Sequence, residues 1–206
     1  MSCRIYTSSM MGCNGYLLET AECCLAVDAP QGFARWVQRH LPQGKRLAHL
    51  LVTHQHFDHV QDAAQLQEET GCTVHAAAPY SDALTLGENL RHWGIDPVAP
   101  FRVDAPFAPG CATLELGGLE CRALHIPGHS TDGAAYYFPA LQSAYVGDIL
   151  FAGSIGRTDF PGGSLARLVA GIREHLATLP PDTELLCGHG PSTSVQEEML
   201  NNPYLC

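Results

Sequence analysis

The feature that most constrains this chain is a dense group of metal-binding side chains at the end of a predicted strand. Apolar residues 47–52 predict a buried strand, and residues 60–70 predict a helix. Between them stand His54, His56, Asp58 and His59, with no cysteine among them. Residues two apart in extended chain project to one face, and the first turn of a helix points at the same volume. Imidazole and carboxylate together suit zinc, iron or manganese, so the pattern predicts a metal site.

Three more residues of metal-binding type directly follow other predicted strands, each beside a glycine. They are His129, Asp148 and His189. Glycine lets the backbone turn sharply and approach other groups closely, and a strand end places a side chain at one rim of a sheet. We therefore expect these three residues to join the first four. The remaining histidines lack this context and are interpreted as structural, with His125 closer to a supporting than a ligating role.

The predicted strands form two runs, each closed by helices. Strands are predicted at residues 16–19, 23–27, 47–52 and 72–76, and then at 113–116, 120–126, 134–138, 143–146 and 184–186; helices are predicted at 33–41, 60–70, 82–91 and 164–179. This order indicates sheets packed together with helices outside. The length of 206 residues suits one domain over residues 1–206, with the irregular segment 79–109 as a candidate cap.

Charge and hydropathy narrow the classes of partner. Eleven Lys+Arg against 21 Asp+Glu give a formal charge of −10, which disfavours nucleic acid as a ligand. No apolar run has membrane-spanning length, and the N-terminal residues lack a secretory hydrophobic region, so we expect a cytoplasmic protein without a membrane partner. The expected partner is a small molecule, and the expected assembly is a monomer or a small homo-oligomer.

The cysteines do not predict a disulfide framework. There are nine of them, an odd number, and no two are spaced Cys-x-x-Cys. Most are expected to be small buried apolar residues in a reducing compartment. Cys187 stands two residues before His189 and is the one interpreted as oxidation-sensitive.

The pattern His-x-His-x-Asp-His at residues 54–59, with the glycine-flanked His129, Asp148 and His189, resembles the metallo-β-lactamase superfamily over essentially the whole chain. The resemblance implies a four-layer αββα sandwich of the α/β class, with the site at one edge between the sheets. Residues 147–163 and the Cys-Gly-His-Gly-Pro run at 187–191 resemble the glyoxalase II-like branch, in its short bacterial type.

By position, the resemblance implies two metal ions, most simply zinc, with iron or manganese as alternatives. Metal 1 would lie on His54, His56 and His129; metal 2 on Asp58, His59 and His189, with Asp148 bridging both. Asp58 and Asp148 are assigned catalytic roles in holding a metal-bridging hydroxide between the ions. β-Lactamases proper tend to carry cysteine where Asp148 stands, and flavodiiron relatives an acidic residue where His56 stands, so both activities are disfavoured.

The resemblance implies hydrolysis of thioesters, in particular S-acylglutathiones such as S-lactoylglutathione. A thiol has a pKa of only about 8.5, so its thiolate leaves with little acid assistance. Arg157 occupies the position of a basic residue that contacts glutathione in this branch. Longer members add C-terminal helical contacts to glutathione that this chain lacks, which leaves the thiol carrier open.

The alternative is a persulfide dioxygenase of the same fold. It would use one iron on His54, His129 and Asp148, and it shares a similar Gly-Arg-Thr-Asp-Phe string. The Gly-His-Gly-Pro ending favours the hydrolase. A nuclease of the same fold is disfavoured by the acidic charge, and a metal-binding protein without catalysis stays open.

Overall fold

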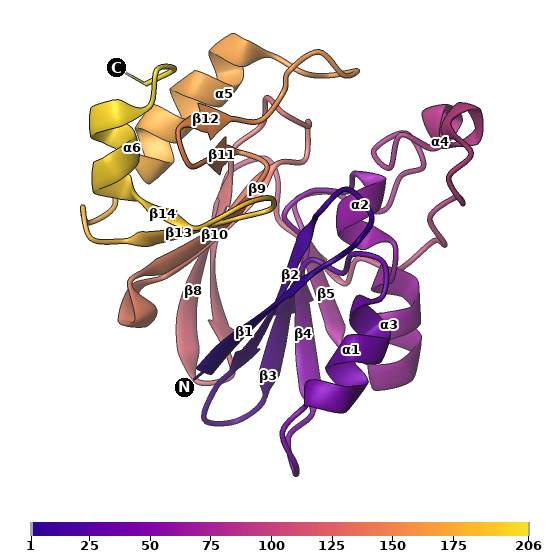
Figure 1. Ribbon diagram of the computed structural model, residues 1–206. Coiled ribbons are helices and arrows are strands. Elements are labelled where there is room, and N and C mark those ends of the chain that lie inside the picture. Colours follow the sequence, from indigo (N-terminus) through magenta and orange to yellow (C-terminus); the bar gives the residue numbers. More distant parts are fainter. Residues whose placement is uncertain (1, 206) are drawn as a thin grey trace.

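The computed structural model describes residues 2–205, whose strands form two six-stranded sheets and one short hairpin (Figure 1). The first sheet has the strand order β1 (Ser2–Thr7), β2 (Asn14–Glu19), β3 (Cys24–Val27), β4 (Leu47–Leu51), β5 (Thr73–Ala76), β6 (Ala105–Pro106). The second has the order β14 (Thr193–Ser194), β13 (Glu184–Cys187), β10 (Ser143–Gly147), β9 (Ala134–Phe138), β8 (Leu119–His125), β7 (Cys111–Leu116). The hairpin pairs β11 (Leu150–Phe151) with β12 (Ser154–Ile155).

The two sheets pack face to face because their strands alternate apolar and polar residues. In β8, Leu119, Cys121 and Ala123 are buried, whereas Glu120 and Arg122 are exposed. The inward set meets side chains of the first sheet in a shared core that includes Leu25, Leu51, Tyr136, Phe138 and Tyr145. A period of two residues with one buried face is what a sheet in a sandwich requires.

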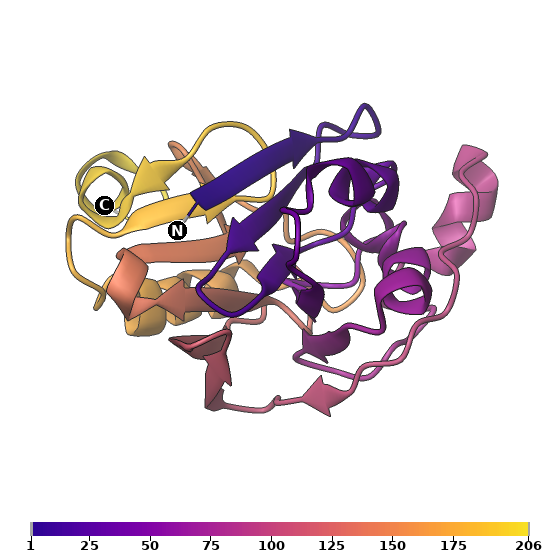
Figure 2. The same ribbon diagram turned by 90° about the horizontal axis from the view of Figure 1, so that it is seen from below.

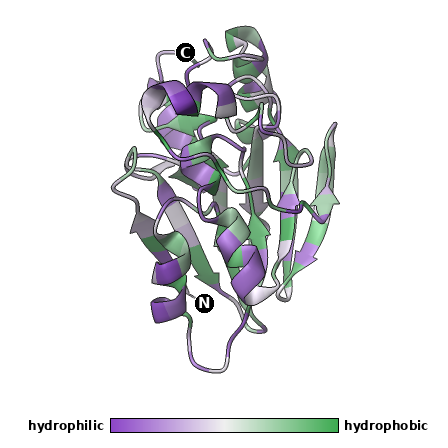
Figure 3. Cartoon of the chain, turned by 90° about the vertical axis from the view of Figure 1, so that its right-hand side faces the viewer, coloured by the Kyte–Doolittle hydropathy of each residue, from purple (hydrophilic) through white to green (hydrophobic). Residues whose placement is uncertain are grey.

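Helices cover both outer faces, which gives four layers. α1 (Phe33–His40) and α3 (Ala63–Thr70) pack on the first sheet, while α5 (Leu165–Gly171), its π-helical continuation η2 (Ile172–Leu176) and α6 (Val195–Asn201) lie on the second. Figure 3 shows hydrophobic strands between helices that carry hydrophilic patches. The predicted αββα sandwich is therefore confirmed. No helix within residues 2–205 combines the length and the apolar character needed to cross a membrane.

Most predicted elements are present, with differences at their ends and in the cap. The helix predicted at 60–70 is α3, which begins at Ala63, and a separate short helix, α2 (Phe57–Val60), precedes it. Between them, Asp62 accepts a hydrogen bond from the Ala34 amide at 3.0 Å. The helix predicted at 82–91 is α4 (Gly87–Trp93), which begins only after Leu86 adopts a φ of 60°. Strands β1, β6, β11, β12 and β14, the short 3₁₀ turn η1 (Pro139–Leu141) and helix α6 were not predicted.

Strand direction sets where the site lies. β3, β4 and β5 run parallel to one another in the first sheet, and β10 runs parallel to β13 in the second, so their carboxyl ends meet at one edge of the sandwich. Figure 2 shows the N-terminal strands beside the C-terminal ones, and Cys13 pairs with His189 in an isolated bridge. Segments from both ends of the chain therefore converge on that edge.

Candidate metal centre

The structure brings all seven predicted ligands together at the edge between the sheets. His54, His56, Asp58 and His59 come from the β4–α2 turn, and the others follow β8, β10 and β13. Donor atoms of His54, His56 and His129 all lie within 4.8 Å of one another, as do those of Asp58, His59 and His189. Two adjacent groups of donors are therefore formed.

Asp148 lies between the two groups. Its Oδ1 is 3.2 Å from His59 Nε2 and 3.5 Å from His189 Nε2, while its Oδ2 is 3.6 Å from His129 Nε2. On the far side of the second group, Asp58 Oδ2 lies 3.3 Å from His189 Nε2. The Asp148 carboxylate thus faces the second group with one oxygen and the first group with the other.

Glycine permits this close approach at two positions. Gly147 precedes Asp148 with a φ of 51°, and a Cβ there would collide with the Thr53 side chain. A Cβ on Gly188 would collide with Asp148 Oδ1 and the ring of His59. The glycines predicted to flank ligands are therefore required by contact between the loops.

Buried polar atoms without partners indicate that these residues fit metal ions. His54 Nε2, His59 Nε2 and Asp148 Oδ1 are inaccessible to solvent and make no hydrogen bond with the described residues, although the last two atoms face each other at 3.2 Å. A buried polar atom left unpaired costs about 1–3 kcal/mol, so three in one cluster need an explanation. A cation bound by all three would satisfy them, and the donor set of imidazoles and carboxylates suits zinc, iron or manganese.

The two groups differ in their affinity for protons. Burial, together with neighbouring imidazoles, lowers the pKa of His54 well below 6.5 and that of His56 to about 3. Burial alone would lower the pKa of His59 and His189 too. Cys13 and nearby carboxylates raise the pKa of His59, and the carboxylates of Asp58 and Asp148 raise that of His189. The same imidazoles lower the pKa of Asp58 and Asp148 against the effect of burial. His54 and His56 of the first group are therefore neutral imidazoles, and the second group is a mixed-charge cluster.

Hydrogen bonds orient the imidazoles. His59 Nδ1 lies 2.8 Å from Asp28 Oδ2, His129 Nδ1 lies 2.7 Å from the carbonyl of Arg157, and His189 Nδ1 lies 3.2 Å from that of Met11. Each contact occupies Nδ1 and leaves Nε2 directed at the cluster. A fixed ring and tautomer are what a metal-binding histidine needs.

Two supporting carboxylates were missed by sequence reasoning. Asp28 is 1% exposed and accepts hydrogen bonds from the Thr53 amide and hydroxyl, both at 2.8 Å, besides contacting His59. Asp132 is 2% exposed and accepts from the Gln55 amide at 3.1 Å. Both carboxylates hold the loop that carries the first four ligands. Asp28 directly follows a predicted strand, the same signal that identified Asp148.

The cysteines differ from expectation at two positions. The eight described cysteines are free, as predicted. Cys187 is fully buried in the core under α5, and burial raises its pKa to about 12, which opposes the predicted sensitivity to oxidation because the thiolate is the reactive form. Cys13, which drew no attention in the sequence, lies instead with its thiol against Asp58, His59 and His189.

A cavity of about 610 Å³ opens onto the cluster. Its floor includes five of the ligands, and its walls are largely apolar: Met11, Phe57, Leu86, Trp93, Ile95 and Phe160. Trp93 of α4 lies with its ring centroid 6.1 Å from Phe57 and 6.3 Å from Phe160. Residues of the predicted cap segment thus line the cavity, although Ala105–Pro106 of that segment belongs to the first sheet.

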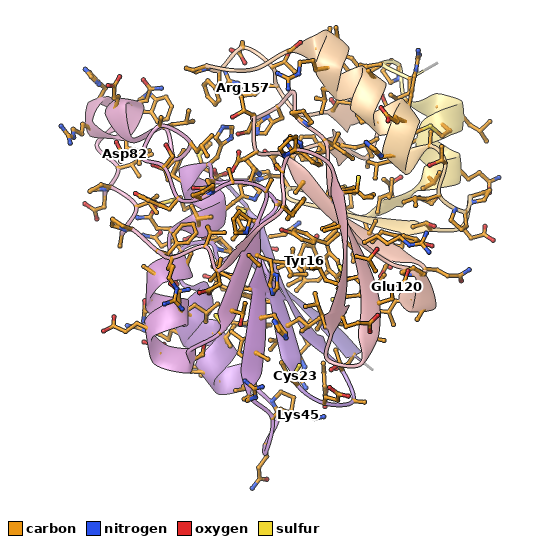
Figure 4. All side chains as sticks on the ribbon, turned by 180° about the vertical axis from the view of Figure 1, so that it is seen from behind. Tyr16, Cys23, Lys45, Asp82, Glu120 and Arg157 are labelled. Atoms are coloured by element: carbon orange, nitrogen blue, oxygen red, sulfur yellow. The ribbon has the colours of Figure 1, made fainter. Side chains whose placement is uncertain are left out.

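Arg157 lies at the rim of this cavity (Figure 4). Its guanidinium makes two hydrogen bonds of 2.7 Å to Asp159 and lies 4.0 Å from the ring centroid of Phe160. The hydrogen bonds to Asp159 raise the pKa of Arg157, and those bonds lower that of Asp159 to about 2. The side chain is 57% exposed, so it can be reached by a solute entering the cavity.

His125 was expected to have a supporting rather than a ligating role. Its ring contacts the carbonyl of Thr131.

Comparison with known proteins agrees with this arrangement. The family described as metallo-beta-lactamase superfamily matches residues 10–189. The hydroxyacylglutathione hydrolase GloC of Haemophilus influenzae is 34% identical over 183 residues, covering 87% of this chain and 86% of that protein.

Three solved structures share the fold over nearly the whole chain. The B3 metallo-beta-lactamase BLEG-1 superposes with a TM-score of 0.87 at 27% identity, covering 99% of both chains. TTHA1623 in a di-iron-bound form has a TM-score of 0.82 at 34% identity, covering 98% of this chain and 100% of that one. ETHE1 from Myxococcus xanthus has a TM-score of 0.78 at 26% identity, covering 98% and 84%. With the sandwich, the glycine-flanked ligands and the paired donor groups in place, this chain belongs to the metallo-beta-lactamase superfamily.

Proposed function

We propose that the protein is a dinuclear metal-dependent thioester hydrolase. The observation that carries the proposal is the position of Asp148, whose two carboxylate oxygens face two separate groups of donors. His54, His56 and His129 would hold one ion; Asp58, His59 and His189 would hold the other. TTHA1623, at 34% identity, is described in a di-iron-bound form, which supports two ions; zinc, iron and manganese all suit the donors.

Two ions held in this way would supply a hydroxide at neutral pH and polarise the acyl carbonyl. The protein's own residues position the groups that this chemistry would need. Asp28 and the Arg157 carbonyl keep His59 and His129 in place, so little reorganisation is needed during reaction. The apolar walls exclude water from the reacting carbonyl, and no side chain has to protonate a thiolate that leaves with a pKa of about 8.5.

The similarity to GloC supports an S-acylglutathione, such as S-lactoylglutathione, as the substrate. Arg157 is the basic group at the cavity rim, and its exposed guanidinium can meet a carboxylate of the glutathione moiety while Asp159 holds it in position. The apolar wall formed by Phe57, Trp93 and Phe160 suits the acyl end or the methylene chain of the thiol.

The alternative function is the mononuclear persulfide dioxygenase. Its three residues, His54, His129 and Asp148, also converge here, since His129 and Asp148 lie 3.6 Å apart and the rings of His54 and His129 are 4.8 Å apart. The hydrolase is favoured because the second donor group is equally well formed, with His189 within 3.5 Å of both carboxylates.

One experiment tests both. The purified protein is stripped, reloaded with zinc, iron or manganese, and analysed for metal content and for turnover of S-lactoylglutathione, glutathione persulfide and a chromogenic cephalosporin. We expect about two equivalents of metal and thioester hydrolysis that a chelator abolishes and metal restores. One equivalent or less under excess metal, or oxygen consumption with the persulfide, would overturn the dinuclear hydrolase. Faster turnover of the cephalosporin would assign the activity named for BLEG-1 instead.

A further inference from the structure

Cys13 stands where the N-terminal loop meets the second donor group. It directly precedes β2, and its thiol is completely buried. The loop is fastened to the His189 loop by the Asn14 amide, which donates to the Gly188 carbonyl at 2.8 Å, and by the contact of His189 Nδ1 with the Met11 carbonyl. The Asn14 side chain adds hydrogen bonds to the carbonyls of residues 187 and 190. The position of the thiol is therefore fixed by the same loop that carries a ligand.

The thiol meets the geometric requirement that the other ligands meet. Cys13 Sγ and one donor atom each from Asp58, His59 and His189 all lie within 4.8 Å of one another. His54, His56 and His129 of the first group satisfy the same limit. The second group thus contains four side chains of ligand type without counting Asp148.

An independent observation points to an ion at this position. His59 is completely buried, and its Nδ1 is taken by Asp28. Its Nε2 faces Asp148 Oδ1 at 3.2 Å, and neither of these two atoms makes a hydrogen bond with the described residues. The thiol of Cys13 contacts the carbonyl of Asn14 at 3.8 Å and interacts with the ring of His59. A cation between the thiol and His59 Nε2 would bind both atoms.

We propose that Cys13 is a further ligand of the second metal ion, through its thiolate. Binding would break the S–H bond, form a sulfur–metal bond and release one proton to solvent, with no change of oxidation state. The inference rests on the proposed metal-dependent function. It makes the two positions chemically unequal: three imidazoles at the first, and thiolate, carboxylate and two imidazoles at the second. Because thiolate is a soft ligand, the second position should prefer zinc, whereas the first tolerates iron or manganese.

Cobalt(II) tests this directly, because a thiolate bound to cobalt gives a sulfur-to-metal charge-transfer band in the near ultraviolet that imidazole and carboxylate do not give. The stripped protein is titrated with cobalt, and the absorbance is followed for the wild type, Cys13→Ser, Cys13→Ala and the control Cys24→Ala. Cys24 is equally buried but lies in the core beneath α1. Thermal melting of each stripped variant checks that it is folded.

We expect the band in the wild type and Cys24→Ala and its loss in both Cys13 variants. The affinity for the second equivalent of zinc should be at least about tenfold lower in the Cys13 variants than in the wild type, while the affinity for the first equivalent is unchanged. A wild-type titration without the band, or Cys13→Ala binding zinc as tightly as the wild type, would return Cys13 to a packing role. A single bound cobalt with a Cys13-dependent band would uphold the ligand while refuting the dinuclear hydrolase, so the two failures are distinguishable.

Discussion

The floor of the cavity and its rim are built in different ways. The ligands on the floor follow strands of both sheets, and Asp28, Asp132 and backbone carbonyls hold them from behind. At the rim, Trp93 is 48% exposed on the short helix α4, and Arg157 is held mainly by its neighbour Asp159. For the proposed hydrolase we therefore expect the chemistry to depend on the sandwich and the selectivity on the loops, so substitutions in the two regions should have different effects.

The largest effect is expected at the centre of the floor. Asp148→Asn removes a charge that faces both donor groups, so metal content should fall and kcat for a thioester should drop at least about 10³-fold. The matched change at the rim, Asp159→Asn, should keep both metals and most of kcat. Metal analysis and steady-state kinetics measure the difference. Two retained metals with a rate within tenfold of the wild type would contradict the role of Asp148.

A change confined to the second donor group should have the next largest effect. His189→Ala should cost about one equivalent of metal and about 10²-fold in thioester hydrolysis. In the dioxygenase alternative, iron sits on other residues, and the variant would keep its iron and consume oxygen with a persulfide. His175→Ala, on η2 and outside the site, is the control. The outcome decides between the two reaction classes.

At the rim, Arg157→Ala should act on binding alone. The carbonyl that holds His129 remains, since only the side chain is removed. KM for a glutathione thioester should rise about threefold to tenfold, while kcat and metal content stay the same, the pattern of lost uniform binding. Arg167→Ala, another exposed arginine, controls for the change in charge. An unchanged KM would leave Arg157 with a structural role only.

Trp93→Ala should have a smaller effect on KM than Arg157→Ala, and its effect should depend on the acyl group. Trp93 connects Phe57 and Phe160 across the cavity, so its loss should raise KM roughly twofold to fivefold for thioesters with large apolar acyl groups and little for lactoyl. Comparison of a series of acyl groups measures this. Equal changes across the series would show that Trp93 shapes the rim without selecting the substrate.

The smallest effect on activity is expected from His75, which lies outside both regions on β5. Burial, with His49 Nδ1 only 3.1 Å from its Nε2, lowers the pKa of His75 to about 4. The unfolded chain binds this proton near pH 6.5 and the folded chain only near 4, so stability falls as the pH drops through that window. Asp104, the other titratable group that acts on His75, opposes the shift.

His75→Gln should remove part of that decline, on the order of 1–3 kcal/mol between pH 6.5 and 4, with unchanged activity at pH 7. Urea unfolding of the metal-free proteins at several pH values measures it, because contributions from the ligands cancel between the two. A variant with the same pH dependence as the wild type would show that His75 titrates normally.

The floor was predictable because its chemistry is visible as local pattern. Each predicted ligand lies in the turn that follows an apolar strand, a position that brings side chains from distant segments to one edge. The same rule applied to Asp28 would have found it. Cys13 follows no predicted strand, and only the pairing of its loop with the His189 loop brings it to the site.

Elements at the periphery were not predicted, or were predicted with the wrong bounds, because their sequence patterns are weak or were not used. β1 is exposed along most of its length and shows no apolar alternation. α6 carried a readable signal: Ser194 accepts a hydrogen bond from the Glu197 amide at 3.2 Å, the Ser-x-x-Glu pattern of a helix start. In the cap, α4 begins five residues later than predicted, because Leu86 stands directly before it with a φ of 60°.

Gln55, which stands between His54 and His56, also reaches the cap. Its side-chain amide donates to the carbonyls of Ala78 and Pro79, both at 3.2 Å, and its carbonyl accepts from the Ser81 amide at 3.1 Å. A movement of the cap that preserves these three bonds has to pivot beyond Ser81. Helix α4 (Gly87–Trp93) lies beyond that point in the chain, so these bonds fix the segment beside the ligand loop and do not reach α4. One glutamine thus links the candidate cap to the loop that carries the first four candidate ligands, so a substitution of Gln55 would disturb both.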